Sequence, residues 1–259
     1  MNEILVLGCG EVGSAVARTL FLAGWRTALW DRPAPSYARR RSCYVDACFG
    51  GQSMLEGVVC RRVDTLAQAE GLVLTMMPLD VLLDAFCPSV LVDARLRKRL
   101  TSPDIRAWAP LTIGIGPGFA AGETVHVAVE SQWGASLGSV VHSGGTTLFS
   151  GEPRPLGGAG RERFVYAAIS GRFREVKELG SQVRQGELVA YLNEQPVLAP
   201  LTGWLRGLSH TGTDVSIRDK IVEVAPSRTM VRPGISERSA RISGAVESVL
   251  GGNPGPPSL

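Results

Sequence analysis

Apolar and polar positions in the first thirty residues follow a regular order. Residues 4–7 form an unbroken apolar run, as in a strand that is buried on both faces of a sheet. From residue 12 to residue 23, apolar positions recur every three or four residues, which is the period of a helix. A second, mostly apolar run at residues 27–30 ends at Asp31. The pattern predicts a strand, a helix and a second strand in that order.

The loop before the predicted helix has the spacing Gly-x-Gly-x-x-Gly. Its first glycine permits a tight turn, the second lets the backbone approach a pyrophosphate, and the third lets helix and strand pack closely. The helix N-terminus points free N–H groups at an anion. An acid 18 residues beyond the last glycine stands where a ribose 2′-hydroxyl is held. We therefore predict nucleotide binding by Gly8, Gly10, Glu11, Val12, Gly13 and Asp31.

Two alternatives remain open at this loop. The glycines could form a plain turn, with Asp31 capping a neighbour. Arg32 follows Asp31, and an arginine at this place can accept a 2′-phosphate, although Asp31 favours an unphosphorylated ribose.

The alternation of strands and helices continues along the chain. Residues 72–76 and 90–93 have the pattern of strands, and residues 79–86 have that of a helix. This order predicts an α/β, Rossmann-like, doubly wound parallel sheet, in which ligands bind beyond the carboxyl ends of the strands. Asp93 and Arg95 follow such an end and are candidate site residues. The alternative is a capping acid followed by a solvated basic helix.

Glycine and proline are dense between residues 113 and 119. Backbone amides at Gly114, Gly116 and Gly118 are candidates for a second anion nest, which would face the glycine loop together with Asp93 and Arg95. The alternative is a turn that leads into a strand at residues 124–130.

The five cysteines all lie in the first third of the chain, and none forms a Cys-x-x-Cys pair. This spacing predicts neither a disulfide framework nor a metal site. Cys9 lies within the glycine loop, where a helix N-terminus would lower the pKa of a thiol. A sulfur or metal carrier is one interpretation of Cys9. The other is a small residue at a place where nothing larger fits.

The second half contains an internal repeat with an offset of 32 residues, in which 170–176 matches 202–208 and 180–183 matches 212–215. A repeated set of short strands predicts two intertwined β-motifs. The segment GSQVRQGELVAYL, residues 180–192, resembles the hairpin of biotinyl/lipoyl-type barrel-sandwich hybrid domains. Such domains carry a modified lysine at the tip, whereas residues 193–196 contain none. The resemblance therefore implies a structural or partner-docking domain.

These patterns together predict five segments. They are a Rossmann-like nucleotide-binding domain at 1–110, a β-rich connector with the glycine-proline loop at 111–163, a lipoyl-like domain at 164–226, a docking helix at 227–250 and a disordered tail at 251–259.

Charge and hydropathy narrow the expected partners. The net charge is only +3 and no lysine-rich tail occurs, which argues against a nucleic-acid partner. No apolar run is long enough to cross a bilayer, and the first residues lack the pattern of a signal peptide. We expect a cytoplasmic protein with no membrane partner. Assembly into a homo-oligomer is left open.

Most of the chain, residues 3–250, resembles accessory proteins of the selenium-dependent molybdenum hydroxylase system. The resemblance rests on the order of several segments rather than on any one of them. These are the glycine loop, DACFGG at 46–51, EGV at 56–58, LVDAR at 91–95 and GIGPGFAAG at 114–122. Residues 132–135 depart from it, because they read QWGA where the family tends to have Asn-Arg-Gly-His.

The resemblance implies an accessory role in the maturation of molybdenum hydroxylases, with such an enzyme as the partner protein. The expected ligand is nucleotide-like, and the expected cofactor is NAD(P) or a molybdopterin dinucleotide, since both carry a pyrophosphate and a ribose. One alternative is an NAD(P)-dependent oxidoreductase of a small substrate, although the chain lacks a Tyr-x-x-x-Lys pair. The other is a non-catalytic nucleotide-binding scaffold. No catalytic residue is assigned.

Overall fold

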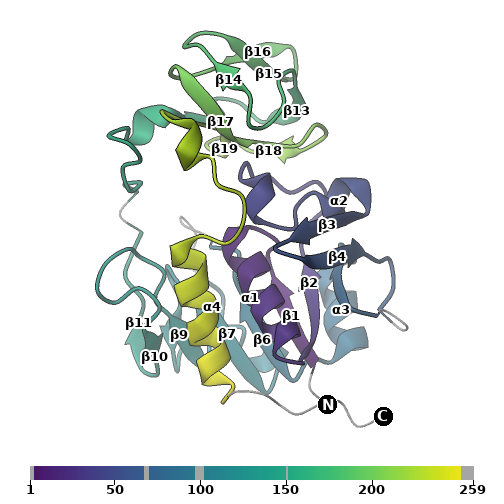
Figure 1. Ribbon diagram of the computed structural model, residues 1–259. Helices are drawn as coiled ribbons and strands as arrows, with labels where there is room; N and C mark the ends of the chain where they lie inside the picture. Colours follow the sequence, from purple (N-terminus) through teal and green to yellow (C-terminus); the bar gives the residue numbers. More distant parts are fainter. Residues whose placement is uncertain (1–2, 67–69, 97–101, 150, 252–259) are drawn as a thin grey trace. The chain divides into compact units, whose positions relative to one another are not determined.

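The computed structural model describes residues 3–66, 70–96, 102–149 and 151–251 (Figure 1). Its contacts divide the chain into two compact units. Unit 1 contains Met1–Arg32, Ser42–Ser150 and Ile235–Leu259, and unit 2 contains Pro33–Arg41 and Gly151–Gly234. Each unit is therefore built from segments that are distant in the sequence.

Unit 1 is organised around a nine-stranded sheet with the order β10-β9-β7-β6-β1-β2-β5-β4-β3. The strands from β9 to β4 are parallel to their neighbours, whereas β3 and β10 run antiparallel at the two edges. A separate two-stranded sheet pairs β8 with β11. The strands are β1 (Glu3–Leu7), β2 (Arg26–Trp30), β3 (Gln52–Leu55), β4 (Val58–Arg62), β5 (Leu72–Thr75), β6 (Val90–Asp93), β7 (Leu111–Ile115), β8 (Ala120–Ala121), β9 (Val127–Val129), β10 (Val140–Val141) and β11 (Gly144–Gly145).

Helices cover this sheet on both faces. α3 (Leu79–Phe86) shares an apolar cluster with Leu5 and Leu91 of the central strands. Since side chains alternate along a strand, Ile4 and Val6 of β1 point to the other face. There α1 (Glu11–Leu22) and α4 (Glu237–Val249) lie side by side (Figure 1).

Short helices complete the list of elements. They are α2 (Ala47–Gly50) and the 3-10 turns η1 (Arg40–Ser42), η2 (Arg106–Trp108), η3 (Arg161–Arg163) and η4 (Arg228–Met230).

The expected Rossmann-like, doubly wound parallel sheet is wrong, because the sheet is mixed and the helices are few. In a doubly wound sheet, helices connect successive parallel strands. Among the described residues, α1 and α3 are the helices that join parallel strands of this sheet, and loops or short turns make the remaining connections. The hairpin of β3 and β4 was not predicted. It turns at Glu56 and Gly57, whose φ values of 44° and 83° suit a two-residue hairpin turn.

Unit 2 consists of two four-stranded antiparallel sheets with the orders β12-β19-β17-β14 and β16-β15-β13-β18. The repeat takes the form of exchanged strands, since β18 of the second copy pairs with β13 and β14 of the first pairs with β17. The strands are β12 (Phe164–Tyr166), β13 (Gly171–Glu175), β14 (Gln182–Val183), β15 (Leu188–Leu192), β16 (Gln195–Leu198), β17 (Gly203–Leu208), β18 (Asp214–Val215) and β19 (Lys220–Ala225).

The boundaries of unit 2 correct the expectation of a lipoyl-like domain confined to 164–226. Residues 33–41 belong to the unit, where Ala38 O accepts a hydrogen bond from Leu208 N and Ala34 O accepts one from Asp214 N. Of the disordered tail expected at 251–259, residues 252–259 lie outside the described residues.

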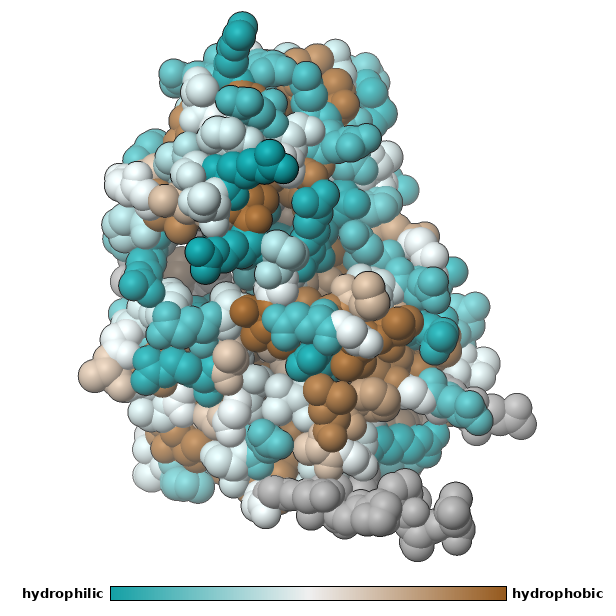
Figure 2. Space-filling model, viewed as in Figure 1, coloured by the Kyte–Doolittle hydropathy of each residue, from teal (hydrophilic) through white to brown (hydrophobic). Residues whose placement is uncertain are grey.

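The face drawn in Figure 2 mixes hydrophilic and hydrophobic residues. Within the described ranges, no helix combines the length and the apolar character needed to cross a bilayer.

Candidate functional site

The carboxyl ends of parallel strands meet at one edge of the unit 1 sheet, and this edge carries the candidate site. The glycine loop follows β1, Asp93 ends β6, and Gly116 follows β7. Because these strands are neighbours in the sheet, the edge gathers the glycine loop, Asp93, Arg95 and the residues 114–118.

The glycine loop is packed too closely for other residues. A Cβ atom added at Gly13 would lie 1.8 Å from Gly8 O, and one added at Gly8 would lie 3.1 Å from Arg95 Cα. Gly8 also has a φ of +102° and donates its amide to Trp30 O at 2.7 Å. The absence of side chains at Gly8 and Gly13 therefore allows the helix, the loop and the residues after β6 to pack closely together.

The first turn of α1 presents unpaired backbone donors. The first bond of the helix runs from Ser14 N to Gly10 O at 2.8 Å. Within the described ranges, the amides of Gly10, Val12 and Gly13 have no hydrogen-bond acceptor. These donors carry the partial positive charge of the helix N-terminus, so an anion is stabilised there.

Asp31 is buried beside this loop. Its Oδ2 accepts a hydrogen bond from Cys9 N, and its Oδ1 accepts one from Arg32 N, both at 2.8 Å. The carboxylate therefore holds the glycine loop against the end of β2.

The expectation of a lowered pKa at Cys9 is wrong. Burial raises the pKa of this thiol well above its usual value, and contact with Cys48 raises it further. The two Sγ atoms are 3.9 Å apart, although the residues are 39 positions apart in the sequence. A fully buried thiol of this kind is unreactive, which favours the interpretation of Cys9 as a small residue in a tight loop.

Asp93 and Arg95 form a closed pair beside Gly8. Arg95 Nε donates to Oδ1 of Asp93 at 2.9 Å, and Nη2 donates to Oδ2 at 2.5 Å. The Arg95 guanidinium also lies 5.8 Å from the centre of the Trp30 ring. The arginine is thus at the predicted edge, but its charge is balanced by the carboxylate two residues earlier.

The glycines at the end of β7 and directly after it are explained largely by packing. A Cβ atom at Gly114 would lie 2.3 Å from the Phe119 ring, and one at Gly116 would lie 3.0 Å from Thr146 Oγ1. Gly116 N already donates to Val129 O at 2.9 Å, which removes it from the expected anion nest. Gly118 has a φ of +87°, as a tight turn requires.

Two residues at this edge were not among the sequence-predicted set. Glu130 is 4% exposed and accepts three backbone hydrogen bonds of 2.7 Å, from Ser131, Gln132 and Thr147. Burial raises the pKa of Glu130, but these amides outweigh it and the pKa is lowered. Arg238 of α4 donates its Nε to Ser131 O at 2.8 Å.

The position of Glu130 in the sequence could have identified it as a site residue. Asp31 follows β2, Asp93 ends β6 and Glu130 follows β9, so an acid stands at the end of three strands. The third acid could have been found by the same argument as the first two. Arg238 could not, because it lies 107 residues from its partner Ser131.

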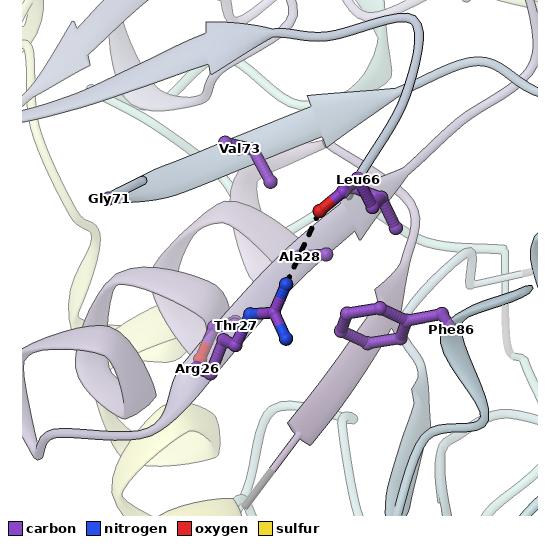
Figure 3. Close-up of a pocket in the computed structure, with 7 residues that line it drawn as sticks. All are labelled: Arg26, Thr27, Ala28, Leu66, Gly71, Val73 and Phe86. Atoms are coloured by element: carbon purple, nitrogen blue, oxygen red, sulfur yellow. Dashed lines mark hydrogen bonds between the residues drawn. The ribbon is translucent and has the colours of Figure 1, made fainter. Parts of the chain in front are cut away.

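A small pocket lies at the opposite edge of the sheet and does not belong to this site. Arg26 spans it, donating to Leu66 O at 3.3 Å and lying 5.8 Å from the centre of the Phe86 ring (Figure 3). Arg26 begins β2, and Gly71 precedes β5. The pocket is therefore at the amino ends of strands, away from the glycine loop. Its lining residues are Arg26, Thr27, Ala28, Leu66, Gly71, Val73 and Phe86.

No protein-family model matches the chain. A relative from Escherichia coli strain K12, named uncharacterized protein YqeB, is 32% identical over 256 residues. The match covers 95% of this chain but 47% of that relative, so the chain spans about half of the relative's length.

Two solved structures show a remote likeness. A succinylglutamate desuccinylase/aspartoacylase from Rhodobacter sphaeroides has 17% identity and a TM-score of 0.23, over 56% of this chain and 59% of its own. The apo ectoine utilization protein EutE (DoeB) from Ruegeria pomeroyi has 12% identity and a TM-score of 0.26, over 85% of each chain. TM-scores this low carry no argument about fold or activity.

These findings correct the family expected from the sequence. No family model matches the chain, and the name of the relative from Escherichia coli gives no function. The expected membership of the selenium-dependent molybdenum hydroxylase family and the expected lipoyl-like domain are therefore not assigned to this chain.

Proposed function

We propose that unit 1 binds a nucleotide-type ligand through its diphosphate, at the carboxyl edge of the parallel strands. The observation that supports the proposal most is the set of unpaired amides at Gly10, Val12 and Gly13. They lie at the start of a helix of 12 residues, whose dipole adds to their partial positive charge. Amides in this arrangement stabilise phosphate oxygens by hydrogen bonds and by the helix dipole.

Asp31 suggests which nucleotides fit. Its carboxylate lies against the loop and can accept a hydrogen bond from a ribose hydroxyl. The same negative charge repels a 2′-phosphate. We therefore expect NAD+ and ADP to bind more tightly than NADP+. Either NAD(P) or another dinucleotide supplies the diphosphate and ribose that the proposal requires.

Calorimetric titration of the full chain with ADP, NAD+, NADP+ and adenosine tests the proposal. We expect ADP and NAD+ to bind, and adenosine to bind at least about tenfold more weakly, because hydrogen bonds to a charged group contribute about 1.5–3 kcal/mol. Absence of binding by ADP, NAD+ and NADP+ at millimolar concentration would contradict it. Mass spectrometry of the native protein would identify any ligand that co-purifies.

A variant pair separates the backbone amide from the side chain at the start of α1. Glu11→Pro removes one N–H at the first helical position, where proline is well tolerated, and the preceding Gly10 is extended with φ −70° and ψ −175°. Glu11→Ala removes only the side chain. We expect Glu11→Pro to bind ADP about five- to tenfold more weakly than Glu11→Ala, since about 1 kcal/mol or more is lost with the amide. Equal affinities of the two variants would remove this amide from the site.

A further inference from the structure

Arg238 brings a positive charge to the same edge from the other end of the sequence. It lies in the first turn of α4, which packs beside α1 (Figure 1). The hydrogen bond from its Nε to Ser131 O, 2.8 Å long, places the guanidinium at the carboxyl end of β9. Ser131 is fixed in turn, because its amide donates to Glu130.

The charges around Arg238 leave part of the guanidinium available. Burial lowers the pKa of Arg238, while the carboxylates of Glu11 and Glu130 act in the opposite direction. Glu130 accepts three backbone amides, and no hydrogen bond joins it to Arg238. Across the described part of the chain, the two Nη nitrogens of Arg238 have no hydrogen-bond partner.

A half-buried guanidinium with two unpaired nitrogens is suited to an anion. Its planar fork of N–H groups matches the oxygens of a phosphate, and water competes poorly where the group is partly buried. The nearby Glu11 opens α1, the helix whose first amides are unpaired. One anion could therefore be shared by the guanidinium and the helix N-terminus.

We propose that Arg238 binds the phosphate oxygens of the ligand whose diphosphate lies at the N-terminus of α1. This inference rests on the proposed nucleotide-binding function and names the residue that supplies its positive charge. Arg95, the arginine expected from the sequence, is less suited, because its Nε and Nη2 are bound to Asp93. Arg238 thus takes the role predicted for Arg95.

The test compares two arginines of the same helix. Arg238→Gln removes the charge at the proposed site, and Arg241→Gln removes an exposed charge three residues later in α4. ADP and adenosine are titrated into the full chain and both variants. We expect Arg238→Gln to weaken ADP binding about tenfold or more and to leave adenosine binding within twofold, because a charged, bidentate contact to phosphate is lost. Arg241→Gln should bind both as the unchanged protein does.

Several results would overturn the inference. ADP binding by Arg238→Gln within twofold of the unchanged protein would exclude the contact. An equal loss of ADP and adenosine binding would assign Arg238 a structural role instead. If Arg238→Gln does not fold, Arg238→Lys replaces it as the test, because lysine keeps the charge but cannot make a bidentate contact. We expect Arg238→Lys to bind ADP measurably, but more weakly than the unchanged protein. An unchanged ADP affinity of Arg238→Lys would contradict a bidentate contact. If the unchanged protein binds no ADP, the proposed function itself fails, which is a separate outcome.

Discussion

Glycine serves two different purposes at the candidate site. At Gly13 the missing side chain lets α1 lie against the loop, since an added Cβ atom would meet Gly8 O at 1.8 Å. At Gly114 the missing side chain makes room for the Phe119 ring. The sequence places both in glycine-rich segments, but only the packing shows that one glycine lets a helix lie against its loop and the other makes room for a core aromatic ring.

Replacing Gly13 with alanine tests this packing at a single residue. We expect Gly13→Ala to destabilise the protein by more than about 2 kcal/mol, because neither backbone segment can move away without disrupting the strand or the helix. The matched control is Gly244→Ala in α4, where no atom lies within 4 Å of the added Cβ. There we expect a gain of about 0.5–1 kcal/mol from helix propensity.

The measurement is the free energy of unfolding in urea for the two variants and the unchanged protein. Equal effects of Gly13→Ala and Gly244→Ala would show that the tight contact at the loop has no energetic consequence.

At the scale of single elements, local pattern was a good guide to the first strands and helices. The expected strand, helix and strand at the start of the chain are confirmed as β1, α1 and β2. The spacing of apolar residues predicts such elements well, because each of them buries a continuous stripe of apolar side chains. The short hairpin of β3 and β4 was missed, because Gln52–Leu55 has little apolar alternation and its partner was not recognised.

Strand direction could not be predicted from the same pattern. The buried strand β9, which lies next to the edge strand β10, pairs in parallel with β7 on one side and antiparallel with β10 on the other. Parallel and antiparallel pairing bury the same apolar residues. The pattern of apolar residues therefore predicts which strands are buried, but not the direction in which they pair. The expectation of a fully parallel sheet failed for this reason.

A buried carboxylate ties together the elements of unit 2. Glu223 of β19 is 2% exposed and pairs with three arginines, which come from residues 33–41, η3 and β17. Burial raises the pKa of Glu223, but the charges of Arg206, Arg39 and Lys220 outweigh it and the pKa is lowered. Because the pKa of Glu223 is lower in the folded than in the unfolded protein, its ionised form stabilises the fold. This stabilisation is present above about pH 4.3, the pKa of an unfolded glutamate, and is lost as the pH falls towards the folded pKa. The three arginines are Arg39, Arg163 and Arg206.

We expect Glu223→Gln to reduce stability by about 3 kcal/mol at pH 7, since it leaves buried arginines without their counter-charge. The difference from the unchanged protein should shrink as pH falls below the unfolded pKa of about 4.3 and towards the lower pKa of the native carboxylate. The difference in the free energy of unfolding is measured by urea unfolding, followed by circular dichroism, at several pH values. Glu187→Gln removes the partner of Lys177 at the protein surface and should change stability much less than Glu223→Gln does. A difference at Glu223 that does not vary with pH would contradict this account.

For the whole molecule, the sequence did not indicate how distant segments combine. Residues 33–41 follow β2 but belong to unit 2, and residues 235–251 follow unit 2 but belong to unit 1. Pro33 and Pro35 at the first crossing and Pro233 and Gly234 at the second predict turns, but a turn does not tell which unit the chain enters next. The arrival of α4 beside α1 matters most, because it is what brings Arg238 to the site.

The central claim is that the amides at the start of α1 bind a diphosphate, and amide chemical shifts test it most directly. A 15N-labelled sample of the full chain is titrated with ADP, and the cross-peaks of single residues are followed. We predict that the amides of Gly10, Val12 and Gly13 move with a common saturation curve, while those of Thr27 and Gly71 at the opposite edge stay in place. Shifts confined to Thr27 and Gly71, or no shift at the glycine loop at saturating ADP, would contradict the claim.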